Sequence, residues 1–149
     1  NNVLDRAPDA AGLNAWVAQM SNGLTREGVV RGFAQSREFV NKTAPAFEGY
    51  MKSIEGDVFN GGAGNDRMAG GIGADTFIFN AGQDGANLVL QIDDWDTVRF
   101  DGFGYNTAGD ALARMTATET AVRFADQGVS IEFAGADLQT MQSVDYLFG

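Results

Sequence analysis

The sequence predicts an α+β fold in three parts: a small helical bundle over residues 1–52, a short parallel β-roll over residues 53–92, and a β-rich cap with one helix over residues 93–149. Three observations lead to this prediction. Apolar residues recur at helical spacing in the first part. A nine-residue unit rich in glycine and aspartate repeats in the second. Apolar and polar residues alternate between turn signals in the third.

The N-terminal part predicts four helices. In residues 9–20, apolar side chains follow the i, i+3, i+4, i+7 pattern at Leu13, Trp16, Val17 and Met20. Thr25 is a suitable N-cap for a second helix that ends near residue 35, a third starts at Ser36, and a fourth starts near Thr43. The fourth carries one apolar face, made by Phe47, Tyr50, Met51 and Ile54. We expect these helices to form a bundle with an ordinary core.

The middle part repeats the unit G-G-x-G-x-D-x-U-x, in which U is apolar, at residues 61–69 and 70–78. Its aspartates stand nine residues apart, at Asp57, Asp66, Asp75 and Asp84. Nine residues can form a six-residue loop and a three-residue strand, which is half a turn of a flattened parallel coil. Glycines permit the positive φ angles that such loops need. The apolar position of each unit should point inward, at Phe59, Met68, Phe77 and Ala86.

The oxygens of these loops suit Ca²⁺, which prefers hard carboxylate and carbonyl donors. One loop cannot supply six or more oxygens, but two stacked loops can. Successive half-turns lie on opposite edges of the coil, so loops 18 residues apart should stack. This spacing pairs the Asp57 loop with the Asp75 loop, and the Asp66 loop with the Asp84 loop.

Only two units are complete, because Glu55 replaces a glycine in the first unit, and Phe79 and Asn80 replace the glycine pair in the last. We therefore expect two or three calcium ions, a third site pairing the Asp75 loop with the segment around Asp93. The alternative is a flexible linker or a set of ordinary β-turns, for which Asp84-Gly85 is suitable. Apolar residues recur at the same position of each unit, which favours the roll over a linker.

Residues 55–84 resemble the RTX (hemolysin-type, repeats-in-toxin) proteins, which carry this nonapeptide, fold it as a parallel β-roll and bind Ca²⁺ in its loops. The resemblance implies aspartate carboxylates and backbone carbonyls as ligands. One site would use Gly62, Gly64, Asp66, Phe79, Ala81 and Asp84. The other would use Ser53, Glu55, Asp57, Gly70, Ile72 and Asp75, and in it Ser53 and Glu55 depart from the motif.

The run from Leu4 to Leu13, with Trp16 and residues 32–39, is similar to a helical domain of unassigned function that recurs beside RTX repeats in secreted bacterial proteins. The similarity covers roughly residues 1–42. It implies an extracellular setting and one further helix before this start. We therefore expect the helical domain to be truncated and the chain to be a fragment of something longer.

The C-terminal part predicts strands at residues 76–79, 88–92 and 96–100, a helix at 106–115 capped by Thr107, a hairpin of 120–125 with 129–133, and a helical turn at 136–141. This layout resembles the cap after RTX repeats in proteins exported by type I secretion. There the last residues, 145–148 here, are part of an uncleaved secretion signal, although a C-terminal edge strand has the same pattern. Asp93, Asp94 and Asp96 are either cation ligands or a solvated acidic loop.

The charge is uneven. Residues 1–52 hold six basic and five acidic side chains, a net of +1, whereas residues 53–149 hold four and fifteen, a net of −11. This acidity argues against nucleic acid or an anionic membrane surface as a partner. No apolar run of 18 residues is present, so no transmembrane segment is predicted.

Together these features predict a calcium-binding, calcium-induced folding module that is secreted or held at a bacterial cell surface and is recognised by type I secretion machinery at its C-terminus. The alternative is a calcium-stabilised adhesion module, whose helical domain binds a polysaccharide or cell-surface partner through Trp16, Phe33 and Tyr50. Catalysis is not expected, because the chain has no histidine or cysteine and no G-x-S-x-G elbow. Any catalytic module would lie upstream of this chain.

Overall fold

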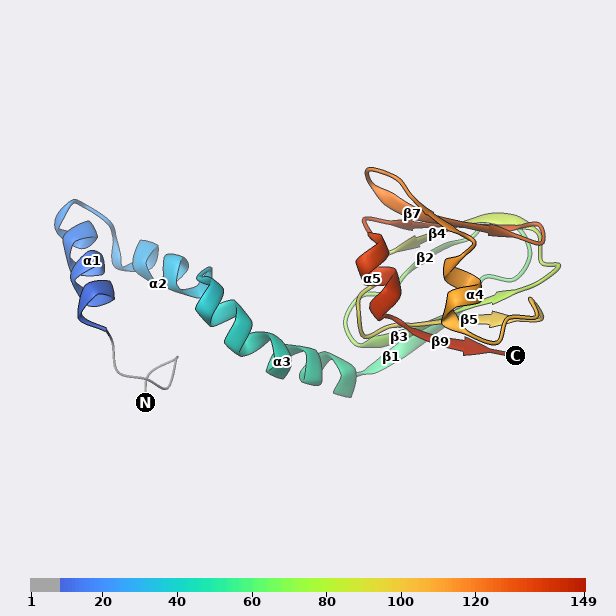
Figure 1. The fold of residues 1–149 in the computed structure, drawn as a ribbon, viewed down its shortest axis with the longest axis horizontal. Coiled ribbons are helices and arrows are strands. Elements are labelled where there is room, and N and C mark those ends of the chain that lie inside the picture. The colour runs from blue at the N-terminus through green and yellow to red at the C-terminus, as the bar shows by residue number, and fades with distance from the viewer. Residues whose placement is uncertain (1–8) are drawn as a thin grey trace. The chain divides into compact units, whose positions relative to one another are not determined.

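A computed structural model describes residues 9–149 of the chain (Figure 1). The fold is α+β, as predicted, with five helices and nine strands among the described residues. The chain divides into two compact units, residues 1–49 and residues 50–149.

The helical unit contains α1 (Ala10–Ser21), α2 (Arg26–Ala34) and most of α3 (Arg37–Ser53). Two side-chain caps start the first two helices. Asp9 accepts the N–H of Gly12 at 2.6 Å, and Thr25 accepts the N–H of Gly28 at 3.1 Å. Both predicted helix starts are therefore confirmed.

Two expectations for this unit are wrong. The predicted third and fourth helices form one helix, α3, with Pro45 inside it. Proline removes one backbone donor, but residues on both sides of Pro45 stay helical. The expected bundle core is also absent from the described part of the unit, because no residue in 9–49 is buried and Val30 is 68% exposed. The contact between α1 and α2 is limited to sites such as Gly32, where a Cβ would lie 2.8 Å from the Trp16 ring.

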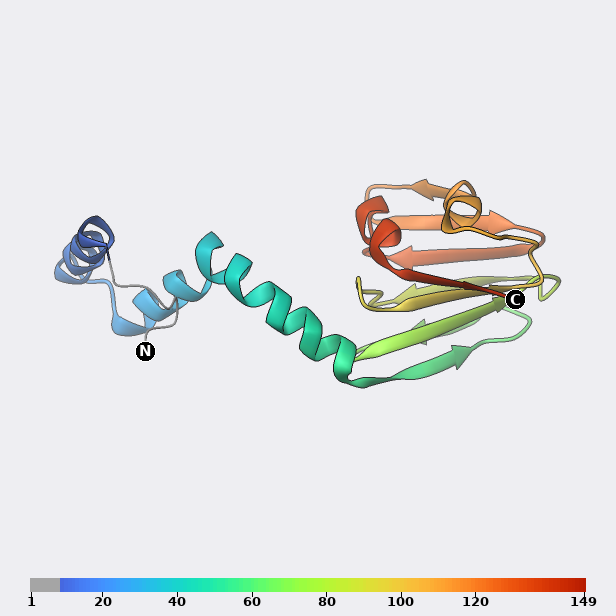
Figure 2. The same ribbon diagram turned by 60° about the horizontal axis from the view of Figure 1, so that its bottom comes forward.

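The second unit contains two sheets (Figure 2). The first contains, in spatial order, β1 (Glu55–Asn60), β3 (Ala74–Asn80), β5 (Thr97–Asp101) and β9 (Asp145–Phe148), all parallel. The second contains β2 (Arg67–Ala69), β4 (Gly85–Leu90), β8 (Val129–Ala134), β7 (Ala121–Asp126) and β6 (Met115–Ala117). In the second sheet β2, β4 and β8 are parallel, and β7 is antiparallel to both of its neighbours.

Strands β1 to β5 alternate between the two sheets, so two consecutive strands complete one turn of a parallel coil. Inward side chains from both sheets form the core, which includes Met68, Phe77, Val89, Val98, Phe100, Val122 and Phe133. Phe59 packs against the end of this core and stacks on Phe77, with ring centroids 5.2 Å apart. The predicted inward positions Phe59, Met68 and Phe77 are therefore confirmed.

The register departs from the prediction after the first turn. Phe59 lies opposite Phe77, 18 residues on, but Met68 lies opposite Val89, 21 residues on. Ala86, predicted to point inward, is exposed, and Val89 fills its place with no exposed surface. The cause is an insertion of three residues: seven positions separate Asn60 from Arg67, but ten separate their partners Ile78 and Leu88, and β3 runs on to Asn80 within this stretch.

The predicted cap elements are largely confirmed. The hairpin of β7 and β8 turns at Gln127 and Gly128, and α5 (Leu138–Ser143) matches the expected helical turn. The helix α4 (Ala108–Leu112) starts after Thr107 as expected, but it is shorter, because Met115 already belongs to β6. α4 and α5 contact each other (Figure 1).

A hydrogen bond from Tyr105 Oη to Asp126 Oδ2, at 2.6 Å, joins two segments of the cap. This bond, with the nearby charge of Arg114, lowers the pKa of Asp126, although partial burial opposes the shift. The depressed pKa contributes stability above the ordinary carboxyl pKa, and that stability is lost as the pH falls through the folded pKa.

We therefore expect Tyr105→Phe to raise the pKa of Asp126 and to cost about 1 kcal/mol of unfolding free energy at pH 7. The difference from the wild type should shrink as the pH falls below about 4. NMR titration and urea unfolding, both in saturating calcium, would measure the two effects. An Asp126 pKa that does not change in the variant would contradict the assignment.

Candidate metal centre

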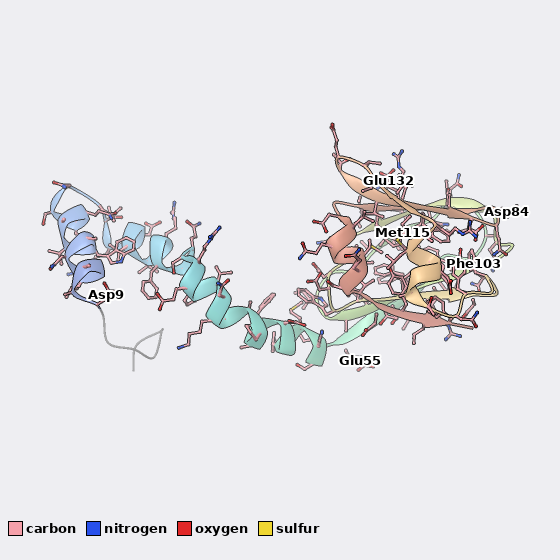
Figure 3. The ribbon with its side chains drawn as sticks, in the orientation of Figure 1. Asp9, Glu55, Asp84, Phe103, Met115 and Glu132 are labelled. Atoms are coloured by element: carbon pink, nitrogen blue, oxygen red, sulfur yellow. The ribbon has the colours of Figure 1, made fainter. Side chains whose placement is uncertain are left out.

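The loops of the coil lie at two opposite ends of its strands. Residues 70–73 and 91–96 precede β3 and β5 at one end, and residues 61–66 and 81–84 precede β2 and β4 at the other. Figure 3 marks the two ends with Glu55 and Asp84. Each end therefore gathers loops that are about two half-turns apart in the sequence.

One hydrogen bond recurs between successive loops. The N–H of Asp57 donates to Asp75 Oδ1 at 2.7 Å, that of Asp66 to Asn87 Oδ1 at 3.2 Å, and that of Asp75 to Asp96 Oδ1 at 2.9 Å. Each contact ties the start of a strand, or the loop before it, to the next turn of the coil on the same edge. The repeating position thus continues at Asn87 and Asp96, three residues later than the nine-residue spacing predicts.

Asp75 has an oxygen without a partner in the protein. The side chain is 1% exposed, Oδ1 accepts the Asp57 N–H, and Oδ2 has no hydrogen-bond partner among the described residues. A Cβ placed on Gly70 would lie 2.7 Å from Asp75 Oδ2 and 2.7 Å from the carbonyl oxygen of Gln91. A buried carboxylate oxygen and a carbonyl of the next loop therefore meet beside a residue with no side chain.

This arrangement fits a hard cation. A buried charged oxygen without a partner is costly, and Ca²⁺ takes carboxylate and carbonyl oxygens together. Gln91 has a φ of +55°, which is uncommon for a residue other than glycine. The backbone of the next loop is thus in an unfavoured conformation at the residue whose carbonyl approaches Gly70.

Negative charge crowds at this end of the coil. Burial raises the pKa of Asp96 to about 6, and the charges of Asp75 and Asp93 add to the shift, against two backbone hydrogen bonds that lower it. Burial and the charges of Asp94 and Asp75 also raise the pKa of Asp93. A divalent cation here would offset the repulsion among these carboxylates.

The other end of the coil has a similar feature. Asp66 Oδ2 is buried without a hydrogen-bond partner among the described residues, next to Gly61, where a Cβ would lie 2.6 Å away. The N–H of Gly64 donates to the Asp84 carbonyl at 3.0 Å, so the predicted loops do meet. The Asp84 carboxylate, however, lies against Gly128 in the β7–β8 turn.

The remaining predicted ligands lie as follows. Gly62 and Gly64 have positive φ angles of 82° and 111°. Phe79 lies inside β3 with its ring in the core, so the loop expected at 79–84 starts only at Ala81, whose N–H donates to the Asp101 carbonyl at 2.9 Å. Ile72 is exposed in the 70–73 loop.

Sequence reasoning did not single out Asn87 or Gln91, and it named Asp96 as either a cation ligand or part of a solvated acidic loop, not as the next position of the repeat. A signal was present, because Asn87 and Asp96 stand nine residues apart, like the earlier aspartates. Within residues 9–149, no three acidic, histidine or cysteine side chains converge on one point. The convergence seen here combines carboxylates with backbone carbonyls, so it needs fewer acidic side chains.

Residues 1–43 match a family model described as a domain of unknown function, DUF4214. The matched segment is the one that sequence analysis likened to a helical domain of unassigned function, and it lies outside the metal centre. No curated protein matches the chain. Among the described helices, none combines the length and apolarity that crossing a membrane requires.

Proposed function

We propose that this chain is a calcium-binding module of RTX type, in which the coil of residues 55–101 is a β-roll that folds when Ca²⁺ binds. The observation that carries the proposal is the buried Asp75 Oδ2, which has no partner among the described residues and lies with the Gln91 carbonyl beside Gly70. A bound Ca²⁺ would provide a positive charge, and several oxygens from two loops would coordinate it. Two or three ions are expected.

At the Asp75 end, the ligands would come from Asp75, from the carbonyls of Gly70 and Ile72, and from one neighbouring segment. That segment is either the chain around Ser53 to Asp57 or the loop of residues 91–96. The closeness of the Gln91 carbonyl to Gly70 favours the 91–96 loop, which also carries Asp93. At the other end, Gly62, Gly64 and Asp66 would face Ala81 and the Asp84 carbonyl, because Gly64 already contacts Asp84.

Folding would follow from linkage between metal binding and the folded state. The carboxylates of residues 53–149 repel one another, and ordering the glycine loops costs conformational entropy. A ligand that binds only the folded state stabilises it by RT ln(1 + [L]/Kd), about 1.4 kcal/mol per site at ten times Kd. Calcium-poor cytosol would leave the chain unfolded and able to pass an export channel, and calcium outside the cell would fold it.

The module would be secreted by bacteria or held at their surface, with type I secretion machinery recognising its C-terminus. The acidity of residues 53–149 supports calcium rather than nucleic acid as the partner. We assign no catalytic step to this chain, and any catalytic module would lie upstream.

A far-UV circular dichroism titration from an EDTA-stripped start tests the proposal. We expect a cooperative gain of β signal at about 0.1–1 mM Ca²⁺. Mg²⁺ at the same concentrations should not produce it, because it prefers small octahedral sites and keeps its waters. A spectrum that is fully folded in EDTA and unchanged by calcium would overturn the proposal.

Apolar exposure on the helices favours a second candidate function, attachment to a polysaccharide or surface partner. Tyr50 is 63% exposed and Val30 is 68% exposed. Trp16 and Phe33 are half-buried, Trp16 against Gly32 and Phe33 near the Phe39 ring at 6.2 Å, so Tyr50 is the better candidate for stacking. A glycan array probed with the wild-type chain and with Tyr50→Ala would test this function.

A further inference from the structure

Asp96 holds two candidate metal-binding segments in place. Its carboxylate is 1% exposed. Oδ1 accepts the N–H of Asp75 at 2.9 Å, and Oδ2 accepts the N–H of Asp93 at 2.8 Å. One buried carboxylate thus fixes the backbone at the start of β3, just after the 70–73 loop, and in the 91–96 loop, the two segments that would surround the ion.

The same residue also contacts the end of the chain. The backbone carbonyl of Asp96 accepts the N–H of Asp145 at 3.0 Å, at the start of β9. From there β9 runs parallel to β5, with Thr97 opposite Asp145. In the sheet order β1-β3-β5-β9, β9 pairs with β5 alone.

We propose that Asp96 is a positioning residue that couples calcium binding at Asp75 to the docking of the C-terminal strand. Its side chain orders the metal-binding loops, and its main chain holds the first residue of β9. This inference rests on the proposed function. Because coupling between two equilibria is reciprocal, calcium secures β9, and docked β9 raises calcium affinity. The C-terminal segment is then most accessible to a partner in the calcium-free chain.

The first test compares Asp96→Asn with Glu119→Gln in the full chain. Glu119 is an exposed acid of the cap, so its variant makes the same change of charge away from the centre. The amide nitrogen of the introduced asparagine cannot accept a hydrogen bond, so one of the two N–H contacts is lost. We expect calcium affinity, measured by calorimetry, to fall about 10- to 100-fold in Asp96→Asn. It should stay within about twofold in Glu119→Gln, since a surface charge has little effect.

Hydrogen exchange in saturating calcium distinguishes a positioning role of Asp96 from general destabilisation of the unit. In Asp96→Asn, the amides of Asp75, Asp93 and Asp145 should exchange at least about tenfold faster, as a loss of about 1.4 kcal/mol implies. Amides of the β7–β8 hairpin should keep their wild-type rates. Uniformly faster exchange across the unit would overturn the positioning role.

A second variant tests the coupling by weakening a contact of β9. Tyr146 donates its hydroxyl to the Met141 carbonyl in α5 at 2.7 Å, a bond that involves none of the proposed ligands. Tyr146→Phe removes this bond, worth about 1 kcal/mol, so coupling predicts a fall of calcium affinity of up to about fivefold. The control is Tyr50→Phe at an exposed tyrosine, which should leave affinity unchanged.

The outcomes separate the two proposals. If the wild-type chain binds no calcium, the proposed function fails. If the wild type binds calcium, but Asp96→Asn matches Glu119→Gln and Tyr146→Phe matches Tyr50→Phe, the coupling fails and the proposed function stands. If Asp96→Asn does not fold even in saturating calcium, the comparison of the two tyrosine variants decides whether the coupling exists.

Discussion

Asp75→Asn is expected to raise the calcium concentration needed for folding about 100-fold. The amide keeps the shape of the side chain and an oxygen for the Asp57 N–H, which now bonds to Oδ1 at 2.7 Å. It replaces Oδ2, the oxygen without a partner among the described residues, with an NH₂ group that cannot bind a cation. The variant therefore removes a proposed ligand with little change in packing.

The same substitution should have the opposite effect without calcium. Asp75 is a buried carboxylate, so removing its charge should relieve a desolvation cost that the proposed cation would otherwise offset. In EDTA, with sucrose as a stabilising osmolyte, the variant should reach the folded spectrum at a lower sucrose concentration than the wild type. Circular dichroism follows both titrations, with Glu119→Gln as the control for charge alone. A variant with the wild-type calcium midpoint would exclude Asp75 as a ligand.

Phe100→Ala is expected to have the largest effect on stability, about 3–5 kcal/mol. Phe100 is 1% exposed and lies where the coil meets the cap. Its ring centroid is 4.7–6.5 Å from those of five other aromatic residues: Phe79, Phe103, Tyr105, Phe124 and Tyr146. Truncation would leave a cavity that rings from several elements cannot easily fill.

Because small domains are stable by only about 5–15 kcal/mol, this loss is a large share of the total. Urea unfolding in saturating calcium would measure it. Phe47→Ala makes the same truncation at a ring that is 56% exposed, and it should change stability by less than about 1 kcal/mol. Equal effects of the two variants would contradict the assignment of Phe100 to the shared core.

The repeat predicted the strand pairing correctly as far as its nine-residue spacing continues without a break. Phe59 and Phe77 face each other as the 18-residue spacing requires. The prediction failed where Phe79 and Asn80 replace the glycine pair, because the alternating run from Thr76 to Phe79 is also a good strand and extends β3. Strand propensity therefore overrode the repeat, and every later position moved by three residues.

The candidate site was predictable only in part, for the same reason. Asp75 and Asp66 stand out in the sequence because each lies in a complete repeat. Gln91 contributes through its backbone, so its side chain gives no signal. In the helical unit, periodicity located the helices, but it did not show that α1 and α2 bury no residue. Burial depends on what a face meets, which the spacing of apolar residues does not specify.

The parallel coil has a consequence for folding kinetics. Parallel neighbours such as β5 and β9, or β4 and β8, come from distant parts of the chain, so each pairing must close a long loop before it gains any contact. The hairpin of β7 and β8 is local, with a two-residue turn. A chain of such high contact order should fold on a timescale of about milliseconds to seconds, and the hairpin should be the most structured region of its transition state. Substitutions in β7 and β8 should then slow folding, whereas those in β1 should mainly speed unfolding.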